Sequence, residues 1–120
     1  MANVILSPPF ADVTVSAVNA YFLQPINSQV VNRWAIQIVS NTWTGSATIK
    51  GRLLGTTATP VAIPYIGIYV NGAVGTGAAT TSALTTTSII EVDASEIEVI
   101  VDVTASSANN MTLSVRPVLG

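Results

Sequence analysis

Apolar and polar residues alternate with a period of two along most of this chain, and no stretch carries the helical period. The segment NRWAIQIVS, residues 32–40, is the plainest case, because Trp34, Ile36 and Ile38 share one face. Successive side chains of a β-strand point to opposite faces, so this pattern predicts a strand. The same reasoning predicts strands in six further segments: 13–23, 46–54, 61–70, 84–95, 97–105 and 111–120.

The spacing of these segments predicts the fold class. Strands recur at intervals of about 10 to 15 residues with turn-forming residues between them, which is typical of all-β sandwiches and barrels. We expect an antiparallel β-sandwich of about seven to eight strands, jelly-roll or immunoglobulin-like, whose two sheets each keep a wet outer face. The length of 120 residues corresponds to one domain. Residues 13–120 are expected to form the sandwich, and residues 1–12 an extended N-terminal arm, because Pro8 and Pro9 oppose a helix.

The composition excludes several classes of function. The chain has no cysteine and no histidine, so thiolate chemistry, the commonest metal ligand and the usual general base near neutral pH are all missing. Only four residues are basic and the net charge is −2, so we expect no nucleic-acid partner. No apolar run approaches the roughly 20 residues of a membrane helix, and we expect neither a membrane partner nor a secretory signal.

The low charge also bears on the partners. Charged residues make up 8% of the chain, against about 25% in an ordinary soluble domain. The surface must therefore consist largely of Thr, Ser, Asn, Ala and exposed aliphatic residues. Lone monomers tend to carry more charge for solubility, whereas a chain covered by copies of itself does not need it. The composition therefore favours a homo-oligomer.

Five carboxylates are the first candidate site: Glu91, Asp93, Glu96, Glu98 and Asp102. Same-face neighbours on a strand lie roughly 6.5 to 7 Å apart, within the separation of paired carboxylates in inverting glycosidases. A calcium site is a second interpretation, although a compact Asp/Asn-rich loop with a glycine is missing. The interpretation we favour is that these charges solvate a sheet face and prevent edge-to-edge pairing.

Two further motifs are weaker. The run from Gly72 to Gly77 is rich in glycine, but it lacks a lysine and has strands rather than a helix beside it, so we interpret it as a mobile inter-strand loop. The triplet from Asn110 to Thr112 matches the N-glycosylation acceptor pattern, but three-residue matches often arise by chance, so we give it no weight.

The sequence shows no set of catalytic residues. The many Ser and Thr residues have no evident activating base, and Lys50 stands on a polar strand face. We therefore expect no enzyme, no catalytic residue, no metal and no cofactor.

The aromatic residues are the remaining candidates. Trp34 is in phase with its apolar neighbours and is expected in the core, whereas Trp43 lies at a turn. Tyr65 and Tyr69 share one face of a predicted strand, so a glycan-binding module that stacks sugars on these aromatic side chains is an alternative to a structural role. Nothing nearby supplies the usual polar cluster of a sugar site. We expect Trp43 to close the end of the sandwich or to contact a neighbouring subunit.

Three segments together carry a resemblance: WTGSATIKGRLLG (43–55), SIIEVDASEIEVIVDVTA (88–105) and TLSVRPVLG (112–120). They resemble small β-sandwich virion proteins encoded among the structural genes of tailed bacteriophages. In that family a Trp-Ser/Thr-Gly opens a strand, and an I-x-V-D-x-S turn leads into a long strand that ends in V-T-A. The usual Y-T-S-G after V-T-A is replaced here by residues 106–110, SSANN.

The resemblance implies a non-enzymatic virion component: a capsid decoration or cement protein, or else a tail or fibre accessory protein. Its expected location is the virion, and its expected partners are copies of itself and the major capsid protein or tail components. An extended arm can add to a neighbour's sheet edge. We therefore expect Pro8, Pro9 and Phe10 to contact other subunits together with Trp43, Tyr65 and Tyr69.

Overall fold

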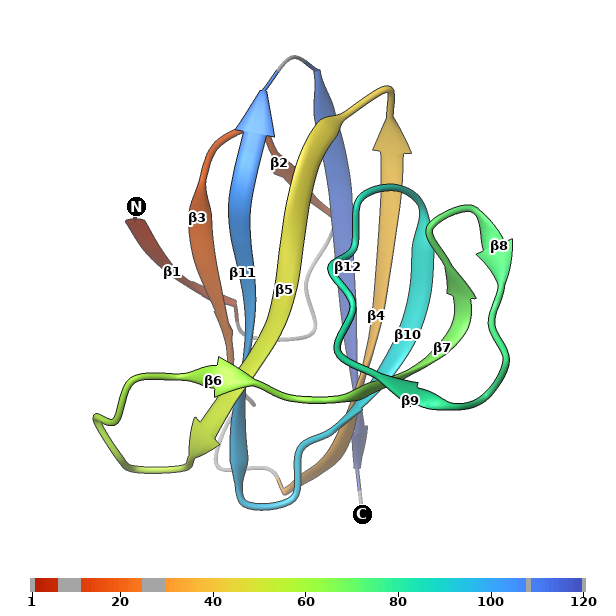
Figure 1. The fold of residues 1–120 in the computed structure, drawn as a ribbon. Coiled ribbons are helices and arrows are strands. Elements are labelled where there is room, and N and C mark those ends of the chain that lie inside the picture. The colour runs from red at the N-terminus through yellow and green to blue at the C-terminus, as the bar shows by residue number, and fades with distance from the viewer. Residues whose placement is uncertain (1, 7–11, 25–29, 108, 120) are drawn as a thin grey trace.

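The computed structural model describes residues 2–6, 12–24, 30–107 and 109–119, and these residues form strands and no helix. The strands build two sheets, which lie face to face as a β-sandwich (Figure 1). The five-stranded sheet has the order β1 (Ala2–Leu6), β3 (Asn19–Leu23), β11 (Ile97–Ser107), β5 (Thr44–Leu53) and β6 (Val61–Ala62). The seven-stranded sheet has the order β2 (Val13–Val15), β12 (Asn110–Leu119), β4 (Val31–Asn41), β10 (Ser88–Asp93), β7 (Tyr65–Val70) and β8 (Ala73–Val74), with β9 (Ala79–Thr80) also paired to β7. All pairings are antiparallel except that of β1 with β3.

The structure confirms the predicted sandwich: most of the side chains that were expected to face inward form a core between the two sheets. On β4, Trp34, Ile36 and Ile38 are buried while the residues between them lie toward solvent. The opposite layer supplies Val99, Val101 and Val103 from β11, all fully buried. Burying side chains of this size contributes about 1.5–3 kcal/mol each, so these facing rows hold the two sheets together.

Two segments that were expected to be single strands pass from one sheet to the other. Residues 13–23 divide into β2 and β3, which belong to different sheets, and Ala17, expected to face inward, is exposed in the crossing. Residues 61–70 divide in the same way into β6 and β7. Pro64, expected at an edge or a bulge, lies in this second crossing, where its missing N–H removes no bond from a sheet.

Residues 2–6 are extended, as expected, but they do not form a free arm. They are β1, which pairs in parallel with β3 of the same chain, with Val4 beside Tyr21. Leu6 is buried, and its carbonyl accepts a hydrogen bond of 2.8 Å from the backbone N–H of Gln24. Pro8, Pro9 and Phe10 lie outside the described residues, as does most of the turn expected at 24–29.

The Asn-Gly pair at 71–72 forms the expected tight turn. Both residues have positive φ, 49° at Asn71 and 84° at Gly72, which is the backbone of a type I′ hairpin turn. The glycine-rich segment that follows was expected to be only a loop, yet it contains β8 and β9, which both pair with β7. Backbone pairing along the side of β7 therefore protects this edge of the seven-stranded sheet.

The outer face of the five-stranded sheet is less exposed to solvent than expected. Ile100 and Asp102 point away from the core, but they are only 1% and 6% exposed. Residues 57–60, from the segment that joins β5 to β6, line the same hollow as these two side chains. In contrast, Leu53 was expected to face inward and is exposed, because β5 ends there at one end of the sandwich.

Candidate functional site

The structure places Trp43 inside its own chain rather than on a binding surface. The indole is 4% exposed, and its Nε1 donates a hydrogen bond of 2.9 Å to the hydroxyl of Ser106. The backbone N–H of Trp43 donates to the hydroxyl of Ser40 at 3.1 Å. The ring lies so close to Gly45 that a Cβ there would meet it at 2.2 Å. Trp43 thus closes one end of the sandwich, which was the first of the two roles expected for it.

The two tyrosines are also engaged within the chain. Tyr65 is 1% exposed, and its hydroxyl donates to the carbonyl of Ser82 at 2.9 Å. Burial raises the pKa of the Tyr65 phenol above its ordinary value of 10.0. Tyr69 is half-buried and donates to the carbonyl of Gly72 at 2.9 Å. Trp43 and Tyr65 therefore present no open ring to a sugar.

The five carboxylates do not form one cluster. Glu91 and Asp93 belong to β10 in the seven-stranded sheet, whereas Glu98 and Asp102 belong to β11 in the five-stranded sheet. The two pairs lie on opposite outer faces of the sandwich. Glu98 and Asp102 are four residues apart on one strand, which corresponds to about 13 Å. This exceeds the roughly 6.5 to 9.5 Å between the carboxylates of an inverting glycosidase.

Glu98 and Asp102 are ion-paired with the two basic residues of β5. Arg52 Nε lies 2.8 Å from Glu98 Oε1, and Lys50 Nζ lies 2.7 Å from Asp102 Oδ2. The pairing register explains both contacts: Arg52 is directly opposite Glu98, while Lys50 is opposite Ile100 and reaches Asp102 diagonally. We call this arrangement of two ion pairs across β5 and β11 the charge ladder.

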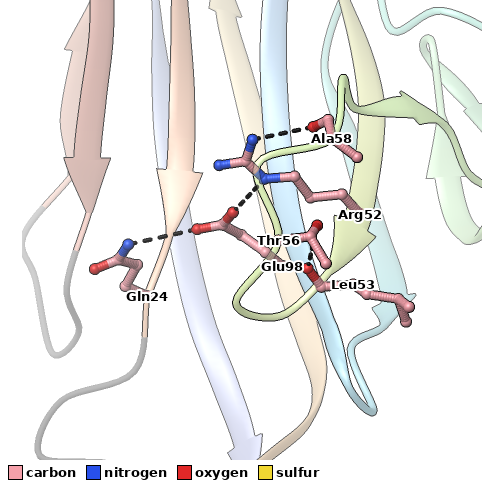
Figure 2. Close-up of polar contacts among 6 residues, drawn as sticks. All are labelled: Gln24, Arg52, Leu53, Thr56, Ala58 and Glu98. Atoms are coloured by element: carbon pink, nitrogen blue, oxygen red, sulfur yellow. Dashed lines mark hydrogen bonds and ion pairs between the residues drawn. The ribbon is translucent and has the colours of Figure 1, made fainter.

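Arg52 connects the charge ladder to the neighbouring segments (Figure 2). Its Nη1 donates to the carbonyl of Ala58 at 3.1 Å, and its guanidinium lies 5.4 Å from the ring centroid of Phe22. On the other side of Glu98, the amide of Gln24 donates to Oε2 at 3.4 Å. The 54–60 segment is in this way held over the sheet by an arginine that is itself fixed by a carboxylate.

Two hollows flank Arg52 on this outer face. The first has a volume of about 360 Å³ and is lined by Asn3, Ala20, Phe22, Lys50, Arg52, residues 57–60, Ile100 and Asp102. The second has a volume of about 430 Å³ and is lined by Leu23, Gln24, Arg52, residues 54–56 and Glu98. Both volumes fall in the range of small-molecule pockets, about 300–1,000 Å³. Arg52 lines both hollows, so they are adjacent, and we call the two hollows together the polar groove.

One carboxylate oxygen in the polar groove lacks a partner. Asp102 Oδ1 is buried and has no hydrogen bond among the described residues, whereas Oδ2 is bound by Lys50. A buried acceptor left unsatisfied costs about 1–3 kcal/mol, so an orphan of this kind calls for an explanation. A ligand that places a hydrogen-bond donor in the groove would explain why this oxygen has no partner among the described residues.

The outer face of the seven-stranded sheet has a different character. Four aliphatic side chains are exposed there, on three adjacent strands: Ile66 and Ile68 of β7, Ile89 of β10 and Val39 of β4. We call these four residues the aliphatic patch. A shallow hollow of about 360 Å³ continues from Val39 and Ile89 toward Ser114, whose hydroxyl donates to Asp12 at 2.5 Å. This face therefore presents exposed aliphatic side chains next to polar ones.

The described residues contain no group of three or more His, Cys, Asp or Glu that could hold a metal ion. In the same part of the chain, no helix is long and apolar enough to cross a membrane. The described surface offers hydrogen bonding and ion pairing in the polar groove and apolar contact at the aliphatic patch.

The sequence contained one signal for the polar groove that the pattern of faces alone did not use. Lys50 and Arg52 are the outward residues of one strand, and Glu98 and Asp102 those of another. Oppositely charged residues on the outward faces of two strands favour pairing of these strands. What the sequence did not indicate was that the 54–60 segment lies beside these charges and accepts a hydrogen bond from Arg52 through the carbonyl of Ala58.

Comparisons of this chain with protein-family models, with curated proteins and with solved structures give no match, so its function is argued from the two outer faces of the sandwich.

Proposed function

We propose that the protein is a non-enzymatic structural component of a bacteriophage virion, a capsid decoration or cement protein that packs through the aliphatic patch against copies of itself and other virion proteins. The observation that carries the proposal is the exposure of four aliphatic side chains on the outer face of one sheet: Val39, Ile66, Ile68 and Ile89. A surface of this kind, with a polar rim, is typical of protein–protein contacts.

The charge of the chain supports the same proposal. Only 8% of the residues are charged, so few charges have to be desolvated when the surface is covered. On the strands of the aliphatic patch, Glu91 and Asp93 are the only carboxylates of β10, and Arg33 is the only basic residue of β4. Contact between two such faces buries mostly aliphatic groups, and each fully buried isoleucine contributes about 1.5–3 kcal/mol.

The role proposed for the N-terminal segment differs from the one expected from the sequence, because residues 2–6 are a strand of the chain's own sheet. Because β1 pairs with β3, deleting residues 2–11 would remove a strand of the chain's own sheet, so loss of assembly after that deletion would not identify a contact. In the described part of the chain β1 is an edge strand, so its backbone offers a pairing side to a neighbouring strand. A tail or fibre accessory protein remains the alternative location for the same type of component.

Sedimentation velocity of the purified chain tests the proposal. We expect wild-type protein to associate as its concentration rises, and Ile68→Lys to shift the population to monomer, because a lysine ammonium would have to be desolvated in the contact. Leu54→Lys is the matched control, since Leu54 and Ile68 are both 54% exposed but Leu54 lies outside the aliphatic patch. A wild-type chain that stays monomeric up to about 1 mM, or equal effects of the two lysines, would overturn this use of the patch.

A further inference from the structure

We propose that the polar groove binds a neutral saccharide, with a hydroxyl of one sugar unit donating to Asp102 Oδ1. This goes beyond a structural role in a particle, and it rests on the outer face of the five-stranded sheet rather than on the aliphatic patch. It also differs from a sugar site at Trp43 and Tyr65, whose rings are buried in the core.

The state of Asp102 sets the first requirement for the ligand. The residue is 6% exposed, lines the first hollow, and keeps Oδ1 without a partner among the described residues. An ionised carboxylate oxygen can only accept, so the ligand has to donate. Lys50 holds the other oxygen, Oδ2, and the lysine side chain is 32% exposed, so its ammonium is also within reach of a ligand in the groove.

The charges of the groove exclude ionic ligands. A sulfate or a fully ionised phosphate would be drawn to Lys50 and Arg52, but it brings no donor for Oδ1 and is repelled by the Asp102 carboxylate. An ammonium ligand can donate, but it meets the same two cations. Each cation is already matched by a carboxylate in the charge ladder, so the groove attracts no net charge. A neutral ligand that both donates and accepts fits these groups.

A sugar ring meets the remaining requirements. Its hydroxyls can donate to Asp102 and accept from Lys50, whose ammonium has three donors and uses one on Oδ2. Its C–H faces fit the apolar wall of the first hollow, formed by Phe22, Ile100 and Pro60. A site that hydrogen-bonds a hydroxyl strongly rejects an analogue lacking it, because its own buried polar group is then left unpaired.

The second hollow extends the inference to a chain of sugars. It lies on the other side of Arg52 and carries Gln24 and Glu98, whose amide and carboxylate are hydrogen-bonded to each other (Figure 2). A linear oligosaccharide can place one unit in each hollow and pass over the guanidinium between them. The outer faces of the two sheets point away from each other, so a chain that packs through its aliphatic patch leaves the polar groove open.

An array of neutral oligosaccharides tests the proposal on the full chain: tetramers of glucose, mannose, galactose and N-acetylglucosamine. The variant that blocks the groove is Ala58→Trp, because Ala58 is exposed, lines the first hollow and contacts Arg52 through its carbonyl only. The matched control is Ala83→Trp, an exposed alanine whose carbonyl likewise accepts a side-chain bond, from Asn71, but which lies outside the groove.

We expect at least one tetramer to bind wild type and Ala83→Trp equally and Ala58→Trp at least about tenfold more weakly. Asp102→Asn, which keeps the size of the side chain and removes its charge, should also weaken binding. Amide chemical shifts in a titration with the same tetramer should change at Ala20, Phe22 and Ile100, which requires no variant to fold. The proposal is overturned if no tetramer binds, if Ala58→Trp binds as well as Ala83→Trp, or if the shifts move only at Ile66 and Ile89.

Discussion

Lys50 and Asp102 form an ion pair of 2.7 Å across β5 and β11, on the outer face of a sheet and yet with the carboxylate almost out of contact with water. The lysine side chain is 32% exposed and that of the aspartate 9%. A pair placed in this way differs from a surface salt bridge, which contributes little, because the carboxylate depends on the lysine for most of its compensation.

Removing one member of this pair should therefore cost more than removing both. We expect Lys50→Met to lower the free energy of unfolding by about 1–3 kcal/mol, since it leaves a buried carboxylate without its cation. The double variant Lys50→Met/Asp102→Leu should recover most of that loss. Urea unfolding measures both, with Arg33→Met as the exposed control, expected within about 0.5 kcal/mol of wild type. Additive losses in the double variant would show that the pair is not coupled.

Trp43 should behave as a core residue. We expect Trp43→Ala to destabilise the fold by about 3–5 kcal/mol, the range for large-to-small changes of an aromatic residue in a core. Ser106→Ala removes only the acceptor of the indole N–H and should cost about 1 kcal/mol. Gly45→Ala should also destabilise, because the added methyl would overlap the indole. Chemical denaturation ranks the three variants, and a neutral Trp43→Ala would place the indole at the surface instead.

Asn71 should contribute through its side chain and its backbone separately. Its Oδ1 accepts from the N–H of Thr85 at 2.8 Å, its Nδ2 donates to the carbonyl of Ala83 at 3.0 Å, and its φ is positive. Asn71→Gly loses the hydrogen bonds but keeps the backbone, so we expect a loss of about 1–2 kcal/mol. Asn71→Ala also strains the backbone and should cost about 1 kcal/mol more. Thermal unfolding distinguishes them, and equal losses would mean that the turn adapts.

Tyr65 should make stability sensitive to alkaline pH. Burial raises its pKa in the folded chain above 10.0, so the neutral phenol is favoured by folding. The stabilisation linked to this shift is fully present below the unfolded pKa and is lost as the pH rises through the folded one. We expect the stability of wild type relative to Tyr65→Phe to fall above about pH 10. Denaturation of both chains from pH 8 to pH 11 measures this difference, and parallel curves would contradict it.

The alternation of faces was sufficient to predict the long strands and most of the core, but it missed β1, β8 and β9. Trp34, Ile36, Ile38 and the valines of β11 face inward as expected, because a period of two fixes the side of each residue once the strand is located. It was not sufficient to place strands in sheets. Each of the segments 13–23 and 61–70 was predicted as one strand from its residue pattern. The pattern did not show that the chain leaves one sheet for the other at 16–18 and at Pro64.

The polar groove was harder to predict for a similar reason. Glu98 and Asp102 were expected to be solvated, and their position on the outer face was right, but each also lines a hollow together with residues of the 54–60 segment. A loop without periodicity carries no sequence signal of what it covers. The pairing of β1 with β3 was also missed, because residues 2–6 do not indicate whether an extended segment joins its own sheet or a neighbour's.

The proposal that this chain is a virion component present in many copies can be tested by quantitative mass spectrometry of density-purified particles from the cells that encode it. The account predicts that the chain bands with the particles in a fixed, high ratio to the major coat subunit. A low ratio would assign it to the tail or a fibre instead of the capsid surface. Its absence from washed particles, with all of the chain remaining in the supernatant, would contradict the account.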